Sequence, residues 1–409
     1  MLPQRIRRFL TVSCLLFSFS AAMRLAAQAR PGYAGDASCV TCHTAEGAGY
    51  LHTAHHLTSS VASKISVLGS FEPDSNKVTI VAPDATSSDP ALYFVMQSDG
   101  ATLTETVYTG FPPDLQHRTE RIDLVTGSGK RGQTYLYWEG DRLFELPISF
   151  WTDGRQWVNS PGFLNGTADF ARPINPGCLE CHATSIQPLS TDPNTNRYDR
   201  STFVPGIACE SCHGPGAAHA QLHAASFSPL TPMPAGQDEQ IVNPAKLSRE
   251  RQVELCAYCH NGIQREAMAP AFSYIPGKPL ADFYKPLDTA QAEHPDVHGH
   301  QVALLERSKC FQSSATMTCS TCHNTHEPEQ VAASFSNRCL TCHAWQACKT
   351  ASAIGPSAKS RCIECHMPIE PTSAIVSQTG DKELHATMRN HWIKIYPGPS
   401  APATNVAFR

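Results

Sequence analysis

A single short pattern, Cys-x-x-Cys-His, constrains this 409-residue chain more than any other feature, because it occurs seven times. The copies use fourteen of the seventeen cysteines, and every Cys-x-x-Cys pair is followed directly by a histidine. Two cysteines three positions apart lie on the same side of a helical turn. From there both thiols can bond to the vinyl groups of one porphyrin, and the adjacent histidine can ligate its iron. The pattern predicts that each copy attaches one c-type haem.

Other uses of paired cysteines explain the pattern less well. A zinc site takes ligands in sets of four and does not require a histidine directly after every pair. A thioredoxin-type dithiol occurs once, near a βαβ pattern. We therefore predict seven covalently attached haems c as cofactors. The attachment residues are Cys39, Cys42, Cys178, Cys181, Cys209, Cys212, Cys256, Cys259, Cys319, Cys322, Cys339, Cys342, Cys362 and Cys365. The proximal iron ligands are His43, His182, His213, His260, His323, His343 and His366.

The N-terminus has the features of an export signal. Three arginines precede an apolar stretch at positions 9–22, and small residues up to Ala29 form a plausible cleavage site. The stretch is shorter than the ~20 residues that span a bilayer, which argues against a retained membrane anchor. We expect residues 1–29 to be a cleaved signal peptide, which takes Cys14 with it. The mature chain is then periplasmic and has no membrane span.

Two cysteines of the expected mature chain belong to no motif. Cys310 and Cys348 would lie in an oxidising compartment, where disulfides form and persist. They could bond to each other or remain buried free thiols, and the sequence leaves both readings open.

Charge limits the partners. Residues 1–29 contain four arginines and no acidic residue, so their removal takes the balance from −4 to −8. Haem propionates add further negative charge, which argues against nucleic acid as a partner. We expect redox proteins as electron donor and acceptor, with a basic patch on the partner.

The spacing of the motifs divides the chain. The first motif lies in residues 30–60, and the other six fall within residues 171–396. Residues 61–170 alternate β-branched and aromatic segments with Gly, Pro and Asp, which predicts an antiparallel β-rich insert. Its role is scaffolding or, alternatively, a wall that shields a haem edge. The expected strands lie at 76–81, 91–96, 101–108, 133–138 and 142–151.

The haem-dense region predicts a different architecture. Its helices should be short, such as one from Ser248 to Cys259 that Ser248 caps, and proline-rich breaks separate them. So few residues per cofactor cannot build a conventional core. We expect a multihaem cytochrome c fold, with mostly short α-helices and loops wrapped around stacked haems. Residues 397–409 look like a disordered tail.

Several segments together resemble the cytochrome c-552/4-type multihaem family. They are GDASCVTCH with a following Thr-x-His, CESCHGPGxxH, MTCSTCHNTHE and CIECHMP. The insert segment RIDLVTGSGKRGQTYLYWEGDRLFELPISFW and the later NSPGF and RPINPGCLECH are also similar to multihaem family members. That family is related to the tetrahaem cytochrome of ammonia oxidisers and, more distantly, to hydroxylamine and tetrathionate oxidoreductases. The resemblance extends over residues 33–395 and is specific for haem binding, but only weakly specific for how the electrons are used.

Each iron needs a sixth ligand or a vacancy, and twelve histidines lie outside the motifs. This supply is enough for two histidines on every iron. Motif position and the resemblance imply five distal ligands, two of them with a near alternative. They are His55 (or His56), His219, His300 (or His298), His326 and His391, followed by His385 and His117.

Two functions are consistent with these features. One is an electron carrier with a chain of mostly bis-histidine haems and no catalytic residue. The other is a multihaem oxidoreductase in which one open iron acts on a small nitrogen or sulfur compound. A structural subunit of a membrane redox complex is a third reading and would also conduct electrons. The sequence contains no Cys-x-x-Cys-Lys string, which excludes a lysine-ligated nitrite-reductase site, and the ample histidines favour the carrier.

Overall fold

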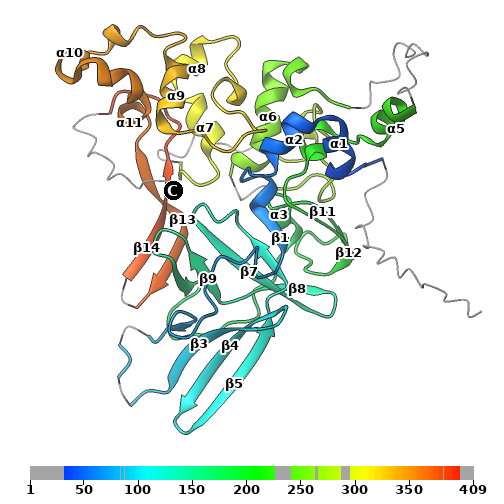
Figure 1. Ribbon diagram of the computed structural model, residues 1–409, viewed down its shortest axis with the longest axis vertical. Helices are drawn as coiled ribbons and strands as arrows, with labels where there is room; N and C mark the ends of the chain where they lie inside the picture. Colours follow the sequence, from blue (N-terminus) through cyan, green and yellow to red (C-terminus); the bar gives the residue numbers. More distant parts are fainter. Residues whose placement is uncertain are drawn as a thin grey trace, which may run out of the picture.

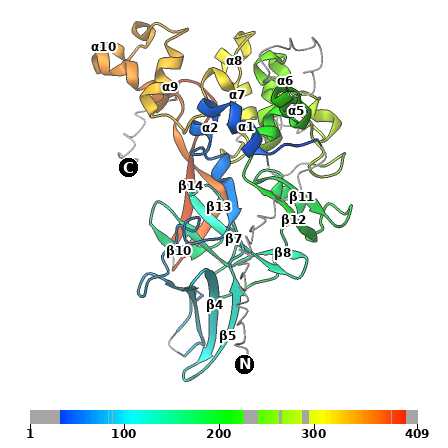
Figure 2. The ribbon, with the colours of Figure 1, turned by 45° about the vertical axis from the view of Figure 1, so that its right-hand side comes forward.

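The computed structural model describes residues 32–82, 84–86, 88–225, 241–262, 266–286, 295–380 and 382–396. The predicted signal peptide, the predicted tail, Cys14 and His294 lie outside these residues. Antiparallel sheets gather at one end of the molecule and short helices at the other (Figures 1 and 2). Strands account for about 28% and helices for about 27% of the chain. The expectation of a mostly helical fold is therefore not confirmed, because hairpins also run through the haem-dense region.

A four-stranded antiparallel sheet forms the end farthest from the helices (Figure 1). Its strands, in order, are β2 (Lys77–Thr79), β3 (Ala91–Asp99), β4 (Thr102–Phe111) and β5 (Asp114–Arg121). Gly100, with φ +59°, opens the two-residue turn between β3 and β4, where glycine adopts the left-handed conformation without strain. Phe94 and Met96 are fully buried two positions apart on β3, as the two-residue repeat of a strand requires.

A second antiparallel sheet lies between the first sheet and the helices (Figure 1). Its order is β1 (Ser59–Val61), β6 (Leu124–Thr126), β7 (Gly132–Glu139), β9 (Ile148–Trp151) and β10 (Gln156–Asn159), with β8 (Arg142–Glu145) paired to β7. Tyr135 and Ile148 from this sheet share one buried cluster with Phe94 and Val78 from the other. The two sheets therefore enclose a common hydrophobic core that does not depend on the cysteine motifs.

Each of the five segments expected to be strands contains at least one strand. Strand β5 was not expected, because its residues DLQHRTER are nearly all exposed and show no apolar alternation. It forms through backbone pairing to β4 along its whole length. The limits proposed for the insert, residues 61–170, stay a prediction.

Short helices make up the other end of the molecule, and α6 shows how the sequence sets one of them. It begins after Ser248, whose side chain accepts a hydrogen bond from the Arg251 amide, as the sequence predicted. None of the helices in the described part is both long and apolar enough to cross a membrane. The α-helices are α1 (Asp36–Cys42), α2 (Thr44–Tyr50), α3 (Pro176–Leu179), α4 (Cys209–His213), α5 (Ala217–Ala225), α6 (Arg249–His260), α7 (Gln301–Glu306), α8 (Lys309–Ser313), α9 (Ala332–Cys339), α10 (Ala351–Ile354) and α11 (Cys362–His366). The 3₁₀ turns are η1 (His56–Thr58), η2 (Pro244–Lys246), η3 (Leu280–Asp282), η4 (Cys319–Thr321), η5 (Trp345–Ala347) and η6 (Gly355–Ser360).

Two hairpins connect the helical end to the sheets. One pairs β11 (Ala183–Pro188) with β12 (Tyr198–Pro205), and the other pairs β13 (Ile369–Thr379) with β14 (Lys382–Arg389). The second hairpin packs Ala386 against Trp151 and Val158 of the insert. The amide of Gly162 also donates to the Val376 carbonyl at 3.1 Å. Strand β14 therefore returns the chain to the helices directly before His391.

Candidate haem-binding site

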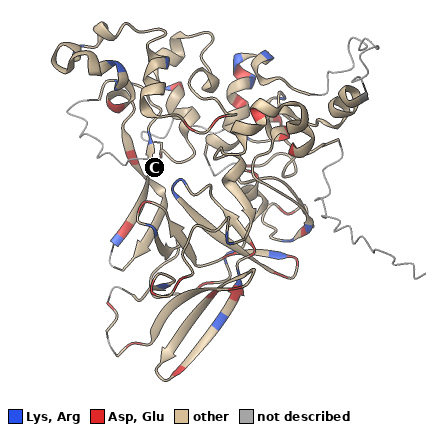
Figure 3. Ribbon diagram, viewed as in Figure 1, with Lys and Arg blue, Asp and Glu red and all other residues tan. Residues whose placement is uncertain are grey.

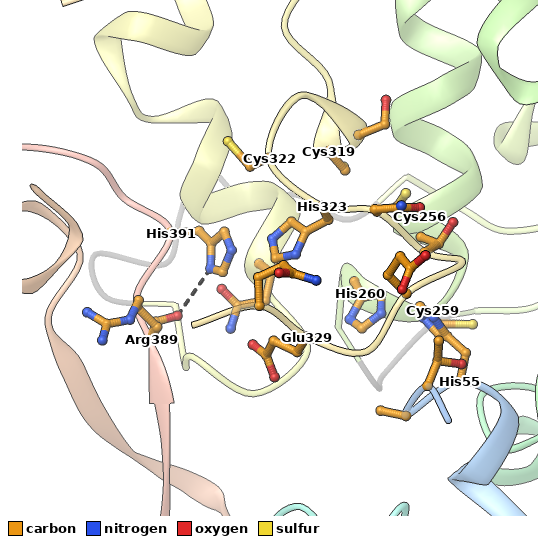
Figure 4. A pocket seen from close by; sticks show the side chains of 18 of the residues that line it. His55, Cys256, Cys259, His260, Cys319, Cys322, His323, Glu329, Arg389 and His391 are labelled. Atoms are coloured by element: carbon orange, nitrogen blue, oxygen red, sulfur yellow. Dashed lines mark hydrogen bonds between the residues drawn. The ribbon is translucent and has the colours of Figure 1, made fainter. Parts of the chain in front are cut away.

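All seven motifs line one continuous cavity of about 4780 Å³ at the helical end. Every motif cysteine and every motif histidine contributes to its wall. Shared among seven porphyrins, the cavity offers roughly 700 Å³ each, within the ~300–1,000 Å³ typical of a ligand site. A part of this wall is drawn in Figure 4, where four imidazoles from distant segments face the same space. The residues present therefore fit covalently attached haems in chemistry and volume.

Each motif forms a single helical turn, which explains the fixed spacing of its residues. The amides of His43, His323 and His343 donate to the carbonyls of the first cysteine of their motifs at 2.9, 3.0 and 3.0 Å. This turn holds both cysteines on one side and places the histidine directly after them. Motifs one, four and six end a helix, whereas motifs three and seven are the whole of α4 and α11.

Four proximal histidines face a second histidine across the cavity. The ring centroids lie 6.0–6.3 Å apart in all four pairs. Two imidazoles that ligate one metal from opposite sides, each about 2.0 Å away, have centroids about 6 Å apart. The spacing is therefore the one that a shared iron requires. The pairs are His43 with His219, His260 with His55, His213 with His326, and His323 with His391.

Burial holds two of the paired imidazoles neutral, which an iron ligand must be. Burial lowers the pKa of His260 to about 4, and the neighbouring His55 contributes further. Burial also lowers the pKa of His391 to about 4, with His323 as the next cause. Both rings therefore keep a free nitrogen lone pair at neutral pH.

Hydrogen bonds orient several of these rings. The Nδ1 atoms of His213 and His366 lie 2.9 and 2.8 Å from the carbonyl oxygens of Val242 and Lys394. His391 Nδ1 lies 3.1 Å from the Arg389 carbonyl, which Figure 4 marks. A carbonyl acceptor fixes the proton on Nδ1 and directs Nε2 away from it. This is the tautomer that leaves Nε2 available to iron.

A close backbone contact places His55. The amide of Ile207 donates to the His55 carbonyl at 2.9 Å, directly before motif three. Gly206 permits the approach, because a Cβ there would lie 2.3 Å from the His56 carbonyl oxygen. His56 itself lies against Tyr50, with ring centroids 5.1 Å apart, and does not line the cavity. The structure thus separates two histidines that the sequence left as rivals.

The second motif has a less defined partner. His182 Nδ1 lies 3.0 Å from the Thr58 hydroxyl, and its pKa is lowered by burial and, to a lesser extent, by His298. His298 lines the cavity, whereas His300, two residues on, does not. Of the two alternatives, only His298 lines the cavity, and its role as a distal ligand stays a prediction.

Motifs six and seven differ from the others. His343 is exposed, and neither His343 nor His366 has an aromatic ring contact among the described residues. Among the weaker candidates, His385 Nδ1 lies 3.0 Å from the Thr372 carbonyl oxygen, and its Nε2 lies 3.5 Å from a Glu383 carboxylate oxygen. His117 packs on Tyr108 in the far sheet, with ring centroids 5.8 Å apart. Neither lines the cavity.

Comparison with known proteins agrees with this site. Residues 162–214, which contain motifs two and three, match the cytochrome c554 and c-prime family. The C-type polyheme cytochrome OmcC of Geobacter sulfurreducens is 27% identical over 170 residues, which are 41% of this chain and 20% of OmcC. The multiheme cytochrome MtrA of Shewanella baltica is 24% identical over 189 residues, 41% of this chain and 52% of MtrA.

The chain is a multihaem c-type cytochrome. The matched region of the chain spans only 20% of OmcC and 52% of MtrA. The fold of the cytochrome is similar to that of the outer cell wall cytochrome OcwA, with a TM-score of 0.54 and 17% identity. That likeness covers 89% of this chain and 80% of OcwA, so it includes the sheets as well as the motifs.

Two buried carboxylates inside the motifs of this cytochrome were not anticipated from its sequence. Glu180, between Cys178 and Cys181, is 4% exposed and accepts hydrogen bonds from the hydroxyls of Tyr258 and Tyr284 at 3.0 and 2.5 Å. Glu210 is 3% exposed and accepts from the amides of Ala34, Gly35 and Gly216, each at 2.8 Å. Each carboxylate ties its motif to another part of the chain. The only sequence signal is an acidic residue at a position inside the motif turn.

The insert supplies part of the cavity wall. Residues 126–134, 145 and 149–153 line it, next to motif side chains. Lys130 pairs with Glu329 at 2.5 Å, and this ion pair lies near His323, which helps to lower the pKa of Glu329. The insert of the cytochrome is therefore both scaffold and wall, which combines the two expected roles.

The segment around motif six carries a concentrated positive charge. Residues 330–361 include four basic residues and no acidic residue, although the whole chain has a balance of −4. Arg338, Lys349, Lys359 and Arg361 are all exposed. Figure 3 marks Lys and Arg positions along the ribbon in blue and Asp and Glu in red. This part of the cytochrome is therefore basic, whereas the expected basic patch was on the redox partner; Arg338, Lys349 and Arg361 also line the cavity.

The two cysteines outside the motifs are not bonded to each other. Cys310 and Cys348 are both free thiols. The Cys348 thiol lies 3.1 Å from the Thr350 hydroxyl. Burial raises the pKa of Cys322, and the nearby Cys310 adds to that rise. Both thiols are therefore free in the structure but only partly buried, so neither of the two readings left open by the sequence describes them fully.

Proposed function

We propose that this cytochrome is a periplasmic electron carrier with seven covalently attached haems c, most of them ligated by two histidines. The observation that carries the proposal is the set of four histidine pairs, with centroids 6.0–6.3 Å apart, across one cavity that every motif lines. A bound haem iron supplies a one-electron redox centre. The residues of the chain do the rest: they attach, orient and space the redox centres.

Histidine ligation favours a low reduction potential. Methionine on one side of an iron raises the potential relative to two imidazoles. The four pairs contain only histidine, and carbonyl or hydroxyl groups orient the rings of His182, His213, His366 and His391. We infer that the carrier exchanges electrons with low-potential redox proteins, whether free or part of a membrane-associated complex.

The periplasmic location belongs to the proposal. Its support is the arginine-rich, apolar N-terminus and the export that thioether formation in bacteria requires. Redox proteins would be both donor and acceptor, and the basic segment at 330–361 favours an acidic partner there.

The test is a haem count followed by low-temperature EPR of the oxidised, purified holoprotein. Mass spectrometry should give seven haems per chain, and quantified EPR should assign most or all of the ferric iron to low-spin haem. Fewer than seven haems, or a majority of high-spin iron, would overturn the proposal.

One observation favours an oxidoreductase as a second candidate. Among the described residues, no imidazole faces His343 or His366. Four other proximal histidines each face a second imidazole. An iron with one protein ligand could bind a small nitrogen or sulfur compound. About one haem in seven in the high-spin state, with a spectral change on adding hydroxylamine, nitrite or tetrathionate, would support this candidate.

A further inference from the structure

The segments that hold motifs one and three are acidic. Residues 31–63 contain two acidic residues and no lysine or arginine. Residues 201–245 contain three acidic residues and likewise no lysine or arginine. The two motifs adjoin, because Asp36 at the start of α1 accepts a hydrogen bond from the Cys209 amide at the start of α4. Negative charge from both segments therefore gathers around the first and third haem sites.

Two carboxylates at this junction have only neutral donors. Asp36 accepts from the Cys209 amide at 2.9 Å and from the Tyr50 hydroxyl at 3.2 Å. Glu210, which is 3% exposed, accepts from three backbone amides at 2.8 Å each. No ion pair involves Asp36 or Glu210 among the residues that the structure describes. Since buried charges are screened less than exposed ones, the charge of Glu210 acts strongly on its surroundings.

The opposite charge surrounds motif six. The segment at 330–361 has four basic residues and no acidic one. Arg338 and Arg361 directly precede the first cysteine of motifs six and seven, and both line the cavity together with Lys349. The two motifs adjoin, because the first amide of α11 donates to a hydroxyl of α9 at 3.1 Å. In the described ranges of the chain, none of these three cations belongs to an ion pair.

The acidic residue inside motif seven does not reverse this charge. Glu364 pairs with Arg389, whose guanidinium lies 3.1 Å away. The same guanidinium donates to the carbonyls of Ile363 and Met367 at 2.8 and 2.7 Å, which holds the pair in place. A cation thus balances Glu364, whereas the carboxylate of Glu210 in motif three is bound by amides alone.

The acidic and basic ends lie apart but border the same cavity. In Figures 1 and 2, α5, which follows motif three, and α10, which follows motif six, lie at opposite sides of the helical end. His213 of motif three faces His326, three residues after His323 of motif five, with centroids 6.0 Å apart. His323 packs on Phe335 of α9, which ends in motif six, with centroids 5.2 Å apart. Ring contacts therefore lead from motif three through motif five to motif six.

Fixed charges of the chain alter the reduction potential of a nearby haem. Reduction adds one negative charge, so a neighbouring cation stabilises the reduced form and raises the potential, whereas a neighbouring anion lowers it. Propionates are the same on every haem, so they do not distinguish the two ends. The difference between the ends comes from the side chains.

We propose that the cytochrome carries electrons in one direction, from the haems of motifs one and three to the haem of motif six, because its fixed charges make the potential rise along this path. Asp36 and Glu210 hold the potential low at one end, and Arg338, Lys349 and Arg361 hold it high at the other. A donor protein with a basic patch is oxidised at the acidic end, and an acceptor with an acidic face is reduced at residues 330–361. One electron passes at a time, and no bond forms or breaks. This inference rests on the proposed seven-haem carrier.

The first test is a redox titration of the wild-type holoprotein, followed by low-temperature EPR. Two variants assign the signals: Cys39→Ala with Cys42→Ala prevents attachment of the first haem, and Cys339→Ala with Cys342→Ala prevents attachment of the sixth. The signal missing from each variant belongs to the missing haem. In the wild type the sixth haem should become reduced at a higher potential than the first. A first haem that is reduced at the same or a higher potential would overturn the proposal.

Charge variants test the cause of the difference. Glu210→Gln should shift the ratio of reduced to oxidised first haem about tenfold toward the reduced form, which is about 59 mV for one electron. Arg338→Gln should shift the sixth haem about tenfold toward the oxidised form. The matched controls Glu139→Gln and Lys64→Gln make the same charge changes at exposed sites outside the cavity wall and should shift neither haem. Equal shifts in variants and controls would assign the effect to net charge and overturn the proposal.

The proposal can be decided even if a variant does not assemble. Without a cysteine variant, the comparison uses the extremes of the wild-type titration. Arg338→Gln should then move the signal of highest potential, and Glu210→Gln, or Asp36→Asn in its place, should move the signal of lowest potential. The reverse pattern overturns the direction. Mass spectrometry separates the two proposals: fewer than seven haems contradicts the carrier, whereas seven haems with the opposite order of potentials contradicts the direction alone.

Discussion

The ring centroids of His323 and His391 lie 6.0 Å apart, with the ring planes 25° from parallel, although one follows η4 and the other follows strand β14 (Figure 4). The β13–β14 hairpin brings His391 to this position, because it is anchored to the insert at one end and returns to the helices at the other. A strand pair thus determines which histidine faces the fifth motif.

Replacing His391 should open one iron without affecting the others. We expect His391→Ala to convert about one ferric haem in seven from low spin to high spin, because the facing imidazole is lost. Low-temperature EPR and the visible spectrum measure the change. His385→Ala is the matched control and should leave the spin state unchanged, since His385 lies outside the cavity wall. Equal spectra for the two variants would contradict the pairing.

The same measurement distinguishes His298 from His300. His298 lines the cavity and, after burial, helps to lower the pKa of His182. His300 does not line the cavity and is not among the causes of that shift. We expect His298→Ala to produce a high-spin signal and His300→Ala to retain the wild-type spectrum. The reverse result would restore His300 as the ligand.

Glu180 should stabilise the junction between motifs two and four. Glu180→Ala leaves the Tyr258 and Tyr284 hydroxyls and the Phe272 amide without their acceptor in a buried site. We expect a loss of about 3 kcal/mol in the free energy of unfolding, measured by guanidinium denaturation. Glu180→Gln keeps an oxygen acceptor and should lose about 1 kcal/mol. The exposed control Glu139→Ala should change the free energy of unfolding by no more than about 0.5 kcal/mol. A loss as large as that of Glu180→Ala would contradict the stabilising role of Glu180.

Glu105 should make stability depend on pH. Its side chain is fully buried in β4, and burial raises its pKa well above the usual value, against a smaller lowering by a backbone hydrogen bond from Ile148. Above a pH of about 4.5 the unfolded chain releases this proton and the folded chain keeps it, so stability falls by about 1.4 kcal/mol per pH unit until the folded pKa is reached.

Glu105→Gln removes this dependence. We expect the variant to match the wild type near pH 4 and to become progressively more stable than it as pH rises, measured as the thermal midpoint at each pH. Glu139→Gln, at an exposed site, should follow the wild type throughout. Parallel curves for Glu105→Gln and the wild type would show that the carboxyl does not titrate in this way.

The basic segment should attract anionic partners. We expect Lys349→Glu with Lys359→Glu to slow electron exchange with ferricyanide about tenfold at low ionic strength, and the effect to vanish near 0.5 M salt, because salt screens exposed charges. Stopped-flow oxidation of the reduced holoprotein measures the rate. Lys64→Glu with Lys77→Glu places the same charge change on the insert and should slow exchange much less. Equal slowing by the two pairs would assign the effect to net charge.

The motif residues could be predicted from sequence because one helical turn contains the complete attachment pattern. The distal histidines His55, His219, His326 and His391 were predicted from their position relative to motifs, and the structure places each opposite a proximal histidine. Their roles as ligands stay predictions. Short-range spacing was informative for His55, His219 and His326, which follow a motif histidine within 12 residues, whereas His391 lies 25 residues after motif seven and reaches the cavity through the β13–β14 hairpin.

Other features depend on tertiary contacts that no local pattern records. His298 and His300 lie in one turn, and only the packing of that turn decides which of them reaches the cavity. Glu180 looks like a solvated acidic residue until Tyr258 and Tyr284 are brought to it from later segments. Strand β5 has seven polar residues out of eight, and it forms because its backbone pairs with that of β4.

The contrast between the two ends of the molecule bears on biogenesis. The insert buries its own core of aliphatic and aromatic side chains, so this part of the nascent polypeptide can fold before it meets any porphyrin. The motif region instead surrounds a cavity of about 4780 Å³, and its walls are joined by a smaller buried cluster and by the hydrogen bonds of Glu180 and Glu210. Filling this cavity with covalently attached haem would complete the packing of the motif region, whereas the insert already has a packed core.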